Sequence, residues 1–590
     1  MMLREKWIVR GGRALPLIEK YGLDPFVARI LAGRLKEESY ESFIDREGSI
    51  FDPSLLLHMD RAVDLLTEAL ENRQRICIVG DYDVDGMTST AILYLGIRRM
   101  YPSADLMTRI PERIGDGYGF GMSIARELVQ EGIGLAITCD NGVREFETAV
   151  YLKEQGVKLI VTDHHEIELD GEGKDVLPKA DAVVNPHRQG DGSPQKTLCG
   201  AFVAYQLIRA MFRRAGLQEE SDSVLRRVKG YAALGTVCDV MPLTRSNRQL
   251  VYQGLKLLNE EPPCGIRAMM KAGSVKEITT YTAGYVLGPM INAGGRLGSQ
   301  NRFLDILISD SEAVCANLAR ELMLLNKQRQ QMTEEGIRDG LLQAEIRSED
   351  KVKVIYLPEL HESIAGLVAG KIREKLSCPA FVLTSSVEGV KGSGRSTEAY
   401  DMFGEMNRVA DIFLKFGGHT MAAGFTLKTE KGREAEAVEA MRRRMNENCT
   451  LSAEDMVPVV YIDAAADPCG ITVEMIRRME ALGPFGTGNT KPLLAMKDIH
   501  ITGIRPLKGG KFFYLFFRTQ MGSGKAICFN SDRLELALAD AVGPEEAAAL
   551  MQGSRPLRDI PMDIVFYAEI DRYNGSESVS IKVQHLRPHI

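Results

Sequence analysis

The sequence has little of several features that would narrow its class at once. Its 10 cysteines are scattered and none forms a Cys-x-x-Cys pair, which argues against a zinc ribbon or disulfide framework and favours a reducing cytoplasm. No uninterrupted run of about 18 apolar residues occurs, so we expect no membrane span. Residues 1–7 lack the apolar core of a signal peptide. The formal net charge of −7 does not indicate nucleic-acid binding, unless basic groups gather in a local groove.

The chain is long enough for several domains. Its 590 residues suggest roughly four domains of about 150 residues each. Residues 1–50 predict a small helical lead-in, and 51–310 alternate strand and helix patterns as in a doubly wound α/β domain. A long helix over 311–346 would connect this domain to a second α/β lobe over 347–460. Short strands over 461–590 fit an oligonucleotide-binding (OB) β-barrel.

One stretch combines a buried-strand pattern with three carboxylates. The apolar run Ile76–Val79 is followed by Asp81, Asp83 and Asp85. If the extended conformation continues, the three side chains project to the same side, and their repulsion calls for a positive partner. Hard divalent cations are the usual partner. An EF-hand is excluded because Ile92 occupies the position that needs glutamate, whereas a solvated acidic turn stays open as an alternative.

Further apolar segments, ending at residues 139, 162, 184 and 237, also lead into polar side chains. The polar residues that follow them are Asp140, Asp163, His164, His165, Asn185 and Asp239. Ligands of open α/β sheets bind at the carboxyl ends of the strands, so we expect these groups to converge in one crevice. Mixed oxygen and nitrogen ligands suit a pair of Mn²⁺ or Mg²⁺ ions better than a structural zinc. Each of these motifs alone is weak evidence for a metal site, since a sequence such as Asp-Asn-Gly commonly forms only a turn.

The order of these motifs resembles the DHH phosphoesterase superfamily. The four matching motifs are Asp81-Tyr-Asp-Val-Asp-Gly86, Asp140-Asn-Gly142, Asp163-His-His165 and Gly235-Thr-Val-Cys-Asp-Val-Met-Pro242. Within the superfamily, three further segments resemble the RecJ family of single-strand-specific DNA exonucleases. These segments are Leu198-Cys-Gly-Ala201, Asn247-Arg248 and Gly288-Pro-Met-Ile-Asn-Ala-Gly-Gly-Arg-Leu-Gly298.

The resemblance implies a two-metal phosphodiesterase, usually Mn²⁺-dependent, with 5′-to-3′ polarity and mononucleotide products. The metal ligands that it implies are Asp140 as the bridging carboxylate with Asp83, Asp85, His164 and Asp239, and Asp81 as a further candidate. It also implies two catalytic residues. His165 would meet the scissile phosphate, and Asp163 would orient a neighbouring imidazole.

The second lobe carries a glycine-rich basic segment, Lys391–Ser396, for which we predict a turn. It is a near miss to a nucleotide-binding P-loop, because Arg395 stands where lysine is needed, and residues 483–490 are another near miss. A phosphate grip by backbone N–H groups and a guanidinium is the better interpretation. Segments at His361, 391–396 and 416–419 resemble the DHH-associated domain, which grips nucleic acid. The RecJ pattern usually has a tryptophan immediately before the histidine that matches His361, whereas this chain has Leu360 there. The difference affects an expected stacking contact and not the chemistry.

The predicted substrate-binding residues come from several parts of the chain. They are Arg113, Asn292, Arg296, His361, Ser393, Arg395, Ser396 and His419. In the last domain, the aromatic run 512–517 beside basic residues is typical of a surface that stacks bases, although a barrel core is the alternative for each ring.

The function predicted from the sequence is a metal-dependent 5′-to-3′ exonuclease that degrades single-stranded DNA in repair and recombination. Single-stranded DNA is the expected substrate of a monomer, with a single-strand-binding protein and a RecQ-type helicase as candidate partners. One alternative is a DHH phosphodiesterase for short oligonucleotides or cyclic dinucleotides, for which the final barrel has no evident use. Another is a scaffold that has lost its metal ligands, which the filled ligand positions disfavour.

Overall fold

The computed structural model describes residues 5–35, 39–112, 119–217, 221–298, 300–573 and 575–589. The chain forms two compact units that are not contiguous in sequence. The catalytic candidates lie in one unit, made of residues 45–452 with 486–488, and the other unit combines residues 1–44 with 453–485 and 489–590. No helix among the described residues is long and apolar enough to cross a membrane.

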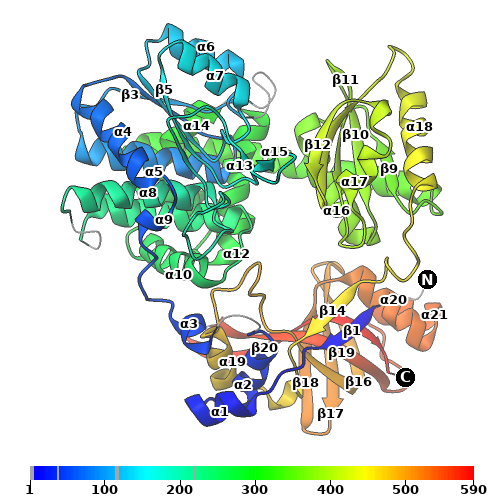
Figure 1. Ribbon diagram of the computed structural model, residues 1–590. Coiled ribbons are helices and arrows are strands. Elements are labelled where there is room, and N and C mark those ends of the chain that lie inside the picture. Colours follow the sequence, from blue (N-terminus) through cyan, green and yellow to red (C-terminus); the bar gives the residue numbers. More distant parts are fainter. Residues whose placement is uncertain are drawn as a thin grey trace. The chain divides into compact units, whose positions relative to one another are not determined.

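A parallel five-stranded sheet organises the first lobe, in the order β3-β2-β4-β5-β8. Its strands are β2 (Ile76–Val79), β3 (Leu106–Arg109), β4 (Leu135–Cys139), β5 (Lys158–Thr162) and β8 (Ala182–Val184). The central strands are continuous apolar runs because helices cover both faces. Helices α6 (Met122–Gln130) and α7 (Phe146–Glu154) cover one face; α4 (Met59–Glu71), α5 (Val84–Met100) and α8 (Gly200–Arg214) cover the other (Figure 1). The predicted doubly wound domain is confirmed.

A small hairpin of β6 (Glu168–Leu169) and β7 (Asp175–Val176) lies between β5 and β8, and more helices follow the sheet. They are α9 (Ser223–Cys238), α10 (Arg245–Glu260), α11 (Cys264–Ala272), α12 (Thr280–Thr282), α13 (Gly288–Leu297) and α14 (Gln300–Ile308). The apolar segment at 232–237, which we grouped with the strands, belongs to α9. That prediction is wrong because α9 is buried around most of its circumference, and a short apolar run does not distinguish a buried helix from a strand.

Helix α15 (Glu312–Ile346) leads to the second lobe, as predicted, and the mixed sheet there has the order β12-β13-β11-β10-β9. Its elements are β9 (Lys353–Tyr356), α16 (Ala365–Leu376), β10 (Ala380–Ser386), β11 (Gly389–Arg395), α17 (Met402–Asn407), β12 (Phe413–His419), β13 (Ala422–Leu427) and α18 (Glu434–Glu447). The turn predicted at 391–396 is wrong, because most of it is strand β11. Gly392 faces the Phe425 ring, where a Cβ would lie 2.3 Å from the nearest ring atom.

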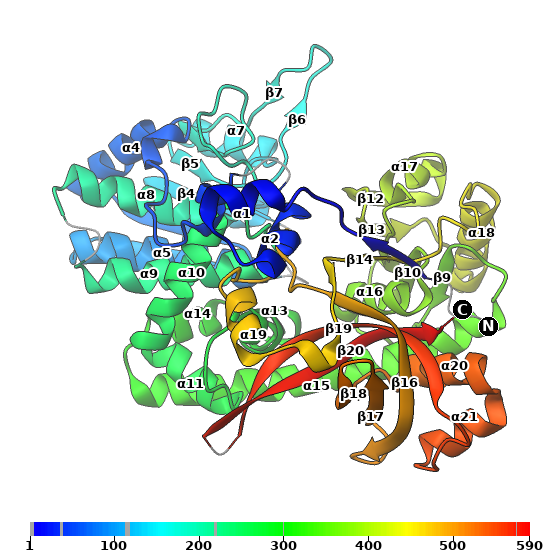
Figure 2. The same cartoon turned by 90° about the horizontal axis from the view of Figure 1, so that it is seen from below.

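The other unit contains a closed barrel, in which β16 pairs with both β17 and β19. Its elements are β15 (Ala464–Ala465), α19 (Val473–Glu480), β16 (Leu494–Leu507), β17 (Phe512–Thr519), β18 (Gly522–Cys528), α20 (Ser531–Val542), α21 (Pro544–Met551), β19 (Ile560–Tyr573) and β20 (Ser576–Pro588). The strands β19 and β20 form a long hairpin (Figure 2). The predicted OB-type barrel is confirmed. Alternation in β17 buries Phe513 and Phe517 in the barrel core and leaves Phe516 exposed.

The N-terminal segment belongs to the barrel unit and is not purely helical as predicted. Strand β1 (Lys6–Val9) pairs in parallel with β14 (Val459–Ile462), and α1 (Leu15–Tyr21), α2 (Pro25–Ala32) and α3 (Tyr40–Ile44) follow it. The buried Asp463 carboxylate accepts hydrogen bonds from Arg34 Nε and Nη2, both at 2.8 Å, and from Arg10 Nη1 at 3.3 Å. These contacts join segments more than 400 residues apart in the chain.

We predict that Arg34→Ala destabilises the barrel unit by about 3–5 kcal/mol, because it leaves the Asp463 carboxylate buried with much of its partner charge removed. The only tryptophan of the chain, Trp7, lies in β1 of this unit, so its fluorescence during urea unfolding reports on the unit selectively. Arg29→Ala, an exposed arginine on α2, is the matched control. Equal transition midpoints for the two variants would contradict the role given to Arg34.

Candidate metal centre and substrate cavity

The first three carboxylates lie where β2 gives way to α5. The chain does not stay extended after Val79, as the same-side argument assumed, because α5 begins at Val84. Asp83 caps the helix by accepting hydrogen bonds from the Asp85 and Gly86 N–H groups at 2.9 and 3.1 Å. Asp85 lies in the first helical turn, so a helix start, and not strand alternation, places these side chains.

Asp85 is held by the N-terminus of a second helix. Its Oδ2 accepts from the Gly200 N–H at 2.6 Å and its Oδ1 from the Ala201 N–H at 2.9 Å. These groups open α8, whose N-terminus carries partial positive charge. This role of residues 198–201 was not predicted, because in the sequence they stood out only by their family resemblance. The available signal was Gly200 itself, because a glycine allows the backbone to approach another group closely.

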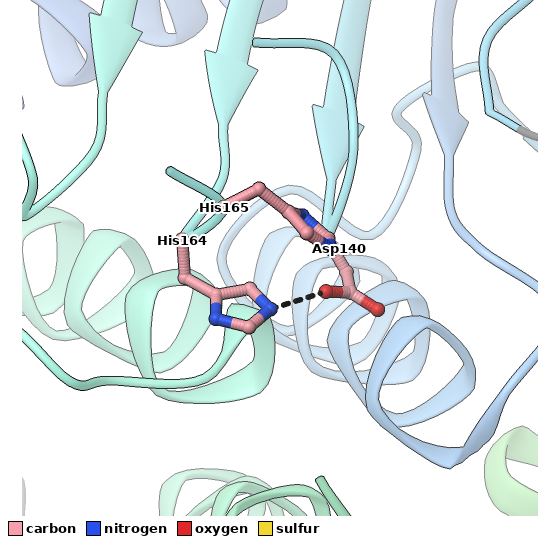
Figure 3. A group of neighbouring side chains, drawn as sticks. All are labelled: Asp140, His164 and His165. Atoms are coloured by element: carbon pink, nitrogen blue, oxygen red, sulfur yellow. Dashed lines mark ion pairs between the residues drawn. The ribbon is translucent and has the colours of Figure 1, made fainter. Parts of the chain in front are cut away.

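Asp140 and His164 meet at the ends of two neighbouring strands, β4 and β5. Figure 3 shows the His164 ring directed at the Asp140 carboxylate, with Nε2 lying 3.0 Å from Oδ1. The same nitrogen lies 3.7 Å from both Asp85 Oδ2 and Asp239 Oδ2. Asp140 has a φ of 62°, an uncommon conformation for a residue other than glycine. The predicted convergence of the strand-end residues is therefore present.

Asp163 holds His165 instead of joining the carboxylate cluster. Its Oδ1 accepts from His165 Nδ1 at 2.7 Å and from the His164 and His165 N–H groups, and its Oδ2 accepts from the Val143 N–H. Burial disfavours the ionised Asp163, but the His165 imidazole and these hydrogen bonds keep the Asp163 pKa below its usual range. Burial likewise opposes charge on His165, but the Asp163 carboxylate raises the His165 pKa to about 9.

The remaining carboxylate, Asp239, follows the end of α9. Burial and the neighbouring carboxylates raise the pKa values of Asp83, Asp140 and Asp239, whereas burial lowers the pKa of His164. Asp239 Oδ2 is buried and has no hydrogen-bond partner among the described residues. A neutral imidazole among crowded carboxylates is the donor set that hard or borderline divalent cations take.

The geometry gives three overlapping groups whose ligand atoms lie within 4.8 Å of one another. They are Asp81, Asp83 and Asp140; Asp85, His164 and Asp239; and Asp140, His164 and His165. All six ligands predicted from the sequence occur in these groups. The residues present therefore fit a centre with more than one divalent cation.

Of the predicted substrate residues, Asn292 lies beside this centre, and Arg296 and His361 lie close to each other. The Asn292 side chain on α13 accepts a hydrogen bond from the Val84 N–H at 3.1 Å, at the start of α5. Arg296 donates to the Ser363 carbonyl, and the Ser363 hydroxyl donates back to the Arg296 carbonyl at 3.2 Å. His361 Nδ1 lies 2.8 Å from Ser363 Oγ. Thus Arg296 and His361 meet through one residue of the second lobe.

A cavity of about 490 Å³ lies over one face of the second sheet. Its lining includes Ser393, which was predicted, and also Tyr82, Lys391, Lys415 and Phe416, which were not. Cross-strand partners of an antiparallel sheet share a face, and Lys391 and Lys415 are both in register with Thr426. The register could not be read from the sequence because β11 was interpreted as a turn.

Arg395 lies at the helix end of this face. A Cβ on Gly366, in the first turn of α16, would lie 3.0 Å from Arg395 Nη2 and 3.5 Å from Ser393 Oγ. A guanidinium, a hydroxyl and a helix N-terminus therefore adjoin one another, and each of them binds phosphate oxygens well.

The remaining predicted residues have different surroundings. Ser396 is buried and its hydroxyl donates to the Tyr400 carbonyl at 2.6 Å, which leaves it no direct path to a substrate. His419 is exposed at the end of β12, in register with Ala422, the partner of Arg395. Arg113 lies outside the described residues. Leu360, at the usual tryptophan position, packs against α15 near Gly336.

Comparisons with known proteins agree with this domain order. Three family models match the chain. They are the DHH family N-terminal domain over residues 75–236, the DHHA1 domain over 349–447 and the RecJ OB domain over 462–585. A parallel sheet with carboxylates and imidazoles at its strand ends, followed by these domains, defines a protein of the DHH class.

Individual relatives narrow the class. The RecJ exonuclease of Salmonella typhimurium is 31% identical over 80% of this chain and 83% of its own length. That of Bacillus subtilis is 32% identical over 88% of this chain, which spans 64% of that longer relative. The crystal structure of RecJ from Thermus thermophilus in complex with Mn²⁺ matches with a TM-score of 0.80 and 27% identity, over 100% of this chain and 80% of that one. The chain belongs to the RecJ family.

We predict that Gly200→Ala lowers the affinity for Mn²⁺ by about 10–100-fold, the usual cost of disturbing a partner of a metal ligand. The added Cβ would lie 2.6 Å from Asp140 Cβ and 2.8 Å from Asp140 Cα, so the backbone of a proposed ligand must move. Isothermal titration calorimetry measures the effect. Gly171→Ala is the matched control, because a Cβ there meets nothing within 4 Å. Unchanged Mn²⁺ affinity in Gly200→Ala would contradict the arrangement.

Proposed function

We propose that this chain is a metal-dependent 5′-to-3′ exonuclease that degrades single-stranded DNA to mononucleotides. The observation that carries the proposal is the convergence of buried carboxylates and imidazoles at the ends of parallel strands, beside a cationic cavity. The substrate class comes from the relatives, whose names describe single-stranded-DNA-specific exonucleases.

In this proposal two Mn²⁺ or Mg²⁺ ions are held by the six ligand side chains. The side chains that would hold them are Asp81, Asp83, Asp85, Asp140, His164 and Asp239, and Asp140 belongs to two of the three ligand groups. Bound there, the cations supply Lewis acidity and positive charge for the hydrolysis of a phosphodiester. The chain's own contribution is to fix the carboxylates in position, and the backbone N–H groups at the α8 N-terminus do this for Asp85.

His165 is the proposed contact to the scissile phosphate. Asp163 accepts a hydrogen bond from His165 Nδ1–H, which fixes the orientation of the ring. The other ring nitrogen, Nε2, is then left to donate to a phosphate oxygen. Asp163 thus acts through His165 and not on the substrate. The neighbouring His164 differs, since its Nε2 already faces three carboxylates.

The second lobe is the proposed grip on the strand. Arg395, Ser393 and the α16 N-terminus would hold one phosphate, and Arg296 another. Lys391 and Lys415 add positive charge to the cavity, where each forms an ion pair with Glu388. In the barrel unit, Phe516 and its half-buried neighbours on β17 offer rings for base stacking on longer strands.

The family membership also supports a cellular role. We infer that the enzyme acts as a monomer in the cytoplasm, in DNA repair and recombination, and that a single-strand-binding protein and a RecQ-type helicase supply or present the strand. These partners follow from the resemblance alone.

The decisive test uses internally labelled oligonucleotides, single-stranded or in a matched duplex, with either end blocked in turn. We expect loss of single strands with Mn²⁺ or Mg²⁺, no loss with EDTA, and protection by a 5′ block only. Asp140→Asn should lower the rate of cleavage more than about a hundredfold. Mutation of a residue that only hydrogen-bonds to a metal ligand already lowers metal affinity or activity by about 10–100-fold, and Asp140 is a proposed ligand itself. Asp60→Asn, an exposed carboxylate on α4, is the control.

Each other outcome removes a specific part of the proposal. Protection by a 3′ block only would keep the metal chemistry and reverse the polarity. Turnover of dinucleotides without loss of long strands would indicate a phosphodiesterase for small substrates. Full activity in Asp140→Asn would overturn the metal assignment.

We predict that Arg395→Ala raises KM for single-stranded DNA by about 10–100-fold. A hydrogen bond to a charged group contributes about 1.5–3 kcal/mol, and its loss corresponds to a change of this size. The slope of log kcat/KM against log salt should fall by about 1, because one phosphate contact is lost. Lys371→Ala removes an exposed cation of α16 that pairs with Glu374, and it should change neither quantity. A wild-type salt slope in Arg395→Ala would contradict the assigned contact.

A further inference from the structure

A second cavity, of about 840 Å³, lies among the helices of the first lobe, away from the metal ligands. Its walls are three helices, α8, α9 and α10, and the segment that enters this unit at residues 47–50. The residues that line it with charged or aromatic side chains are Glu47, Tyr205, Arg209, Arg213, Arg226, Lys229, Tyr252, Lys256 and Glu260. Its size is that of a small-molecule site.

The lining is mainly cationic. Five of its side chains are arginine or lysine and two are glutamate. Both glutamates face solvent and their ion pairs are long, at 4.0 Å between Lys256 and Glu47 and 3.8 Å between Arg226 and Glu260. Two of the arginines have closer partners outside the lining, Arg213 in Asp52 at 2.7 Å and Arg226 in Glu261 at 3.2 Å. Exposed pairs of this kind contribute little and exchange readily for a stronger anion.

The wall formed by residues 45–51 is fixed in place. Gln253 on α10 donates to the carbonyls of Arg46 and Gly48 at 3.0 and 2.9 Å, and the buried Arg209 donates to the carbonyl of Phe51 at 3.0 Å. The Arg46 guanidinium lies 4.4 Å from the centre of the Tyr252 ring. The concavity is therefore built by buried and half-buried polar contacts, and not by a loop resting on the surface.

The cavity is at the far end of the helices that hold the metal centre. Arg209 and Arg213 follow Gly200 on α8 by about 14 and 20 Å, at roughly 1.5 Å per residue. Lys229 precedes Asp239 by about 15 Å on the same scale. A molecule in this cavity is thus separate from a strand at the metal ligands.

We propose that this cavity binds a nucleoside polyphosphate as a ligand distinct from the DNA substrate. Arginine and lysine side chains would take the phosphate chain, since forked guanidinium groups bind phosphate oxygens in pairs. Tyr252, with Leu225 and Leu257 in the same lining, supplies the apolar and aromatic surface that a base requires. An acidic peptide shares the charge but does not need an aromatic side chain in the lining.

Binding of ATP and GTP to the full-length protein is measured by isothermal titration calorimetry in EDTA, which excludes binding through metal ions at the catalytic centre. Arg213→Glu and Lys256→Glu should each raise Kd at least tenfold. Arg214→Glu reverses the next charge on α8, which pairs with Asp64 and does not line the cavity, so its Kd should equal that of the wild type. Mn²⁺ binding and circular dichroism check that the variants remain folded.

Four results would overturn the proposal. The first is no binding of either nucleotide at millimolar concentration. The second is equal affinity for inorganic triphosphate, which would remove the role of the base. The third is loss of binding in Lys415→Glu but not in Arg213→Glu, which would place the nucleotide in the cavity of the second sheet. The fourth is preferential binding of a fluorescein-labelled polyglutamate peptide, which would assign the surface to an acidic protein segment.

Discussion

The mutual repulsion of buried carboxylates is the constraint on which the catalytic unit depends. Asp83 and Asp85 at the start of α5, Asp140 after β4 and Asp239 after α9 come from three different segments and approach one another at the ends of the parallel sheet. Folding must bring like charges together and remove them from water, which is costly unless positive charge compensates. The unit supplies part of that compensation itself, through the α8 N-terminus at Asp85 and the start of α5 at Asp83. Cations would supply the rest, so folding and metal binding are expected to be thermodynamically linked.

The two adjacent imidazoles, His164 and His165, have different surroundings and therefore different chemical roles. His164 is buried, and burial lowers its pKa, so it is a neutral ring able to coordinate a cation. His165 has the Asp163 carboxylate on Nδ1, which raises its pKa to about 9 against the opposing effect of burial. Groups whose pKa values are pushed apart in this way take different chemical roles. The pair therefore separates ligation from contact with the phosphate although only one peptide bond lies between them.

The parallel strands were predicted correctly, because buried strands are short apolar runs, and so was the proximity of the polar side chains that follow them. The sequence did not predict how Asp85 and Asp239 are placed, since one begins a helix and the other ends one, and a buried helix such as α9 has the same apolar run as a strand. The β11 strand was missed because its glycines are typical of turns, whereas here Gly392 makes room for Phe425 and Gly394 for Met402 and Phe381. The pairing of β1 with β14 depends on contacts across more than 400 residues, for which no local pattern exists.

The helices between the metal centre and the basic cavity are packed too closely to move independently. A Cβ at Gly96 of α5 would lie 2.6 Å from Ile208 of α8, and one at Gly254 of α10 would lie 2.4 Å from Ala233 of α9. Close-packed helices transmit strain because the contacts between them leave little room to absorb a displacement. A ligand at one end can change the affinity at the other only if it favours one arrangement of these helices, and the effect must then be reciprocal. The small residues at these contacts thus let the helices of the first lobe pack as one rigid unit. The carboxylates lie at one end of these helices and the cationic cavity at the other.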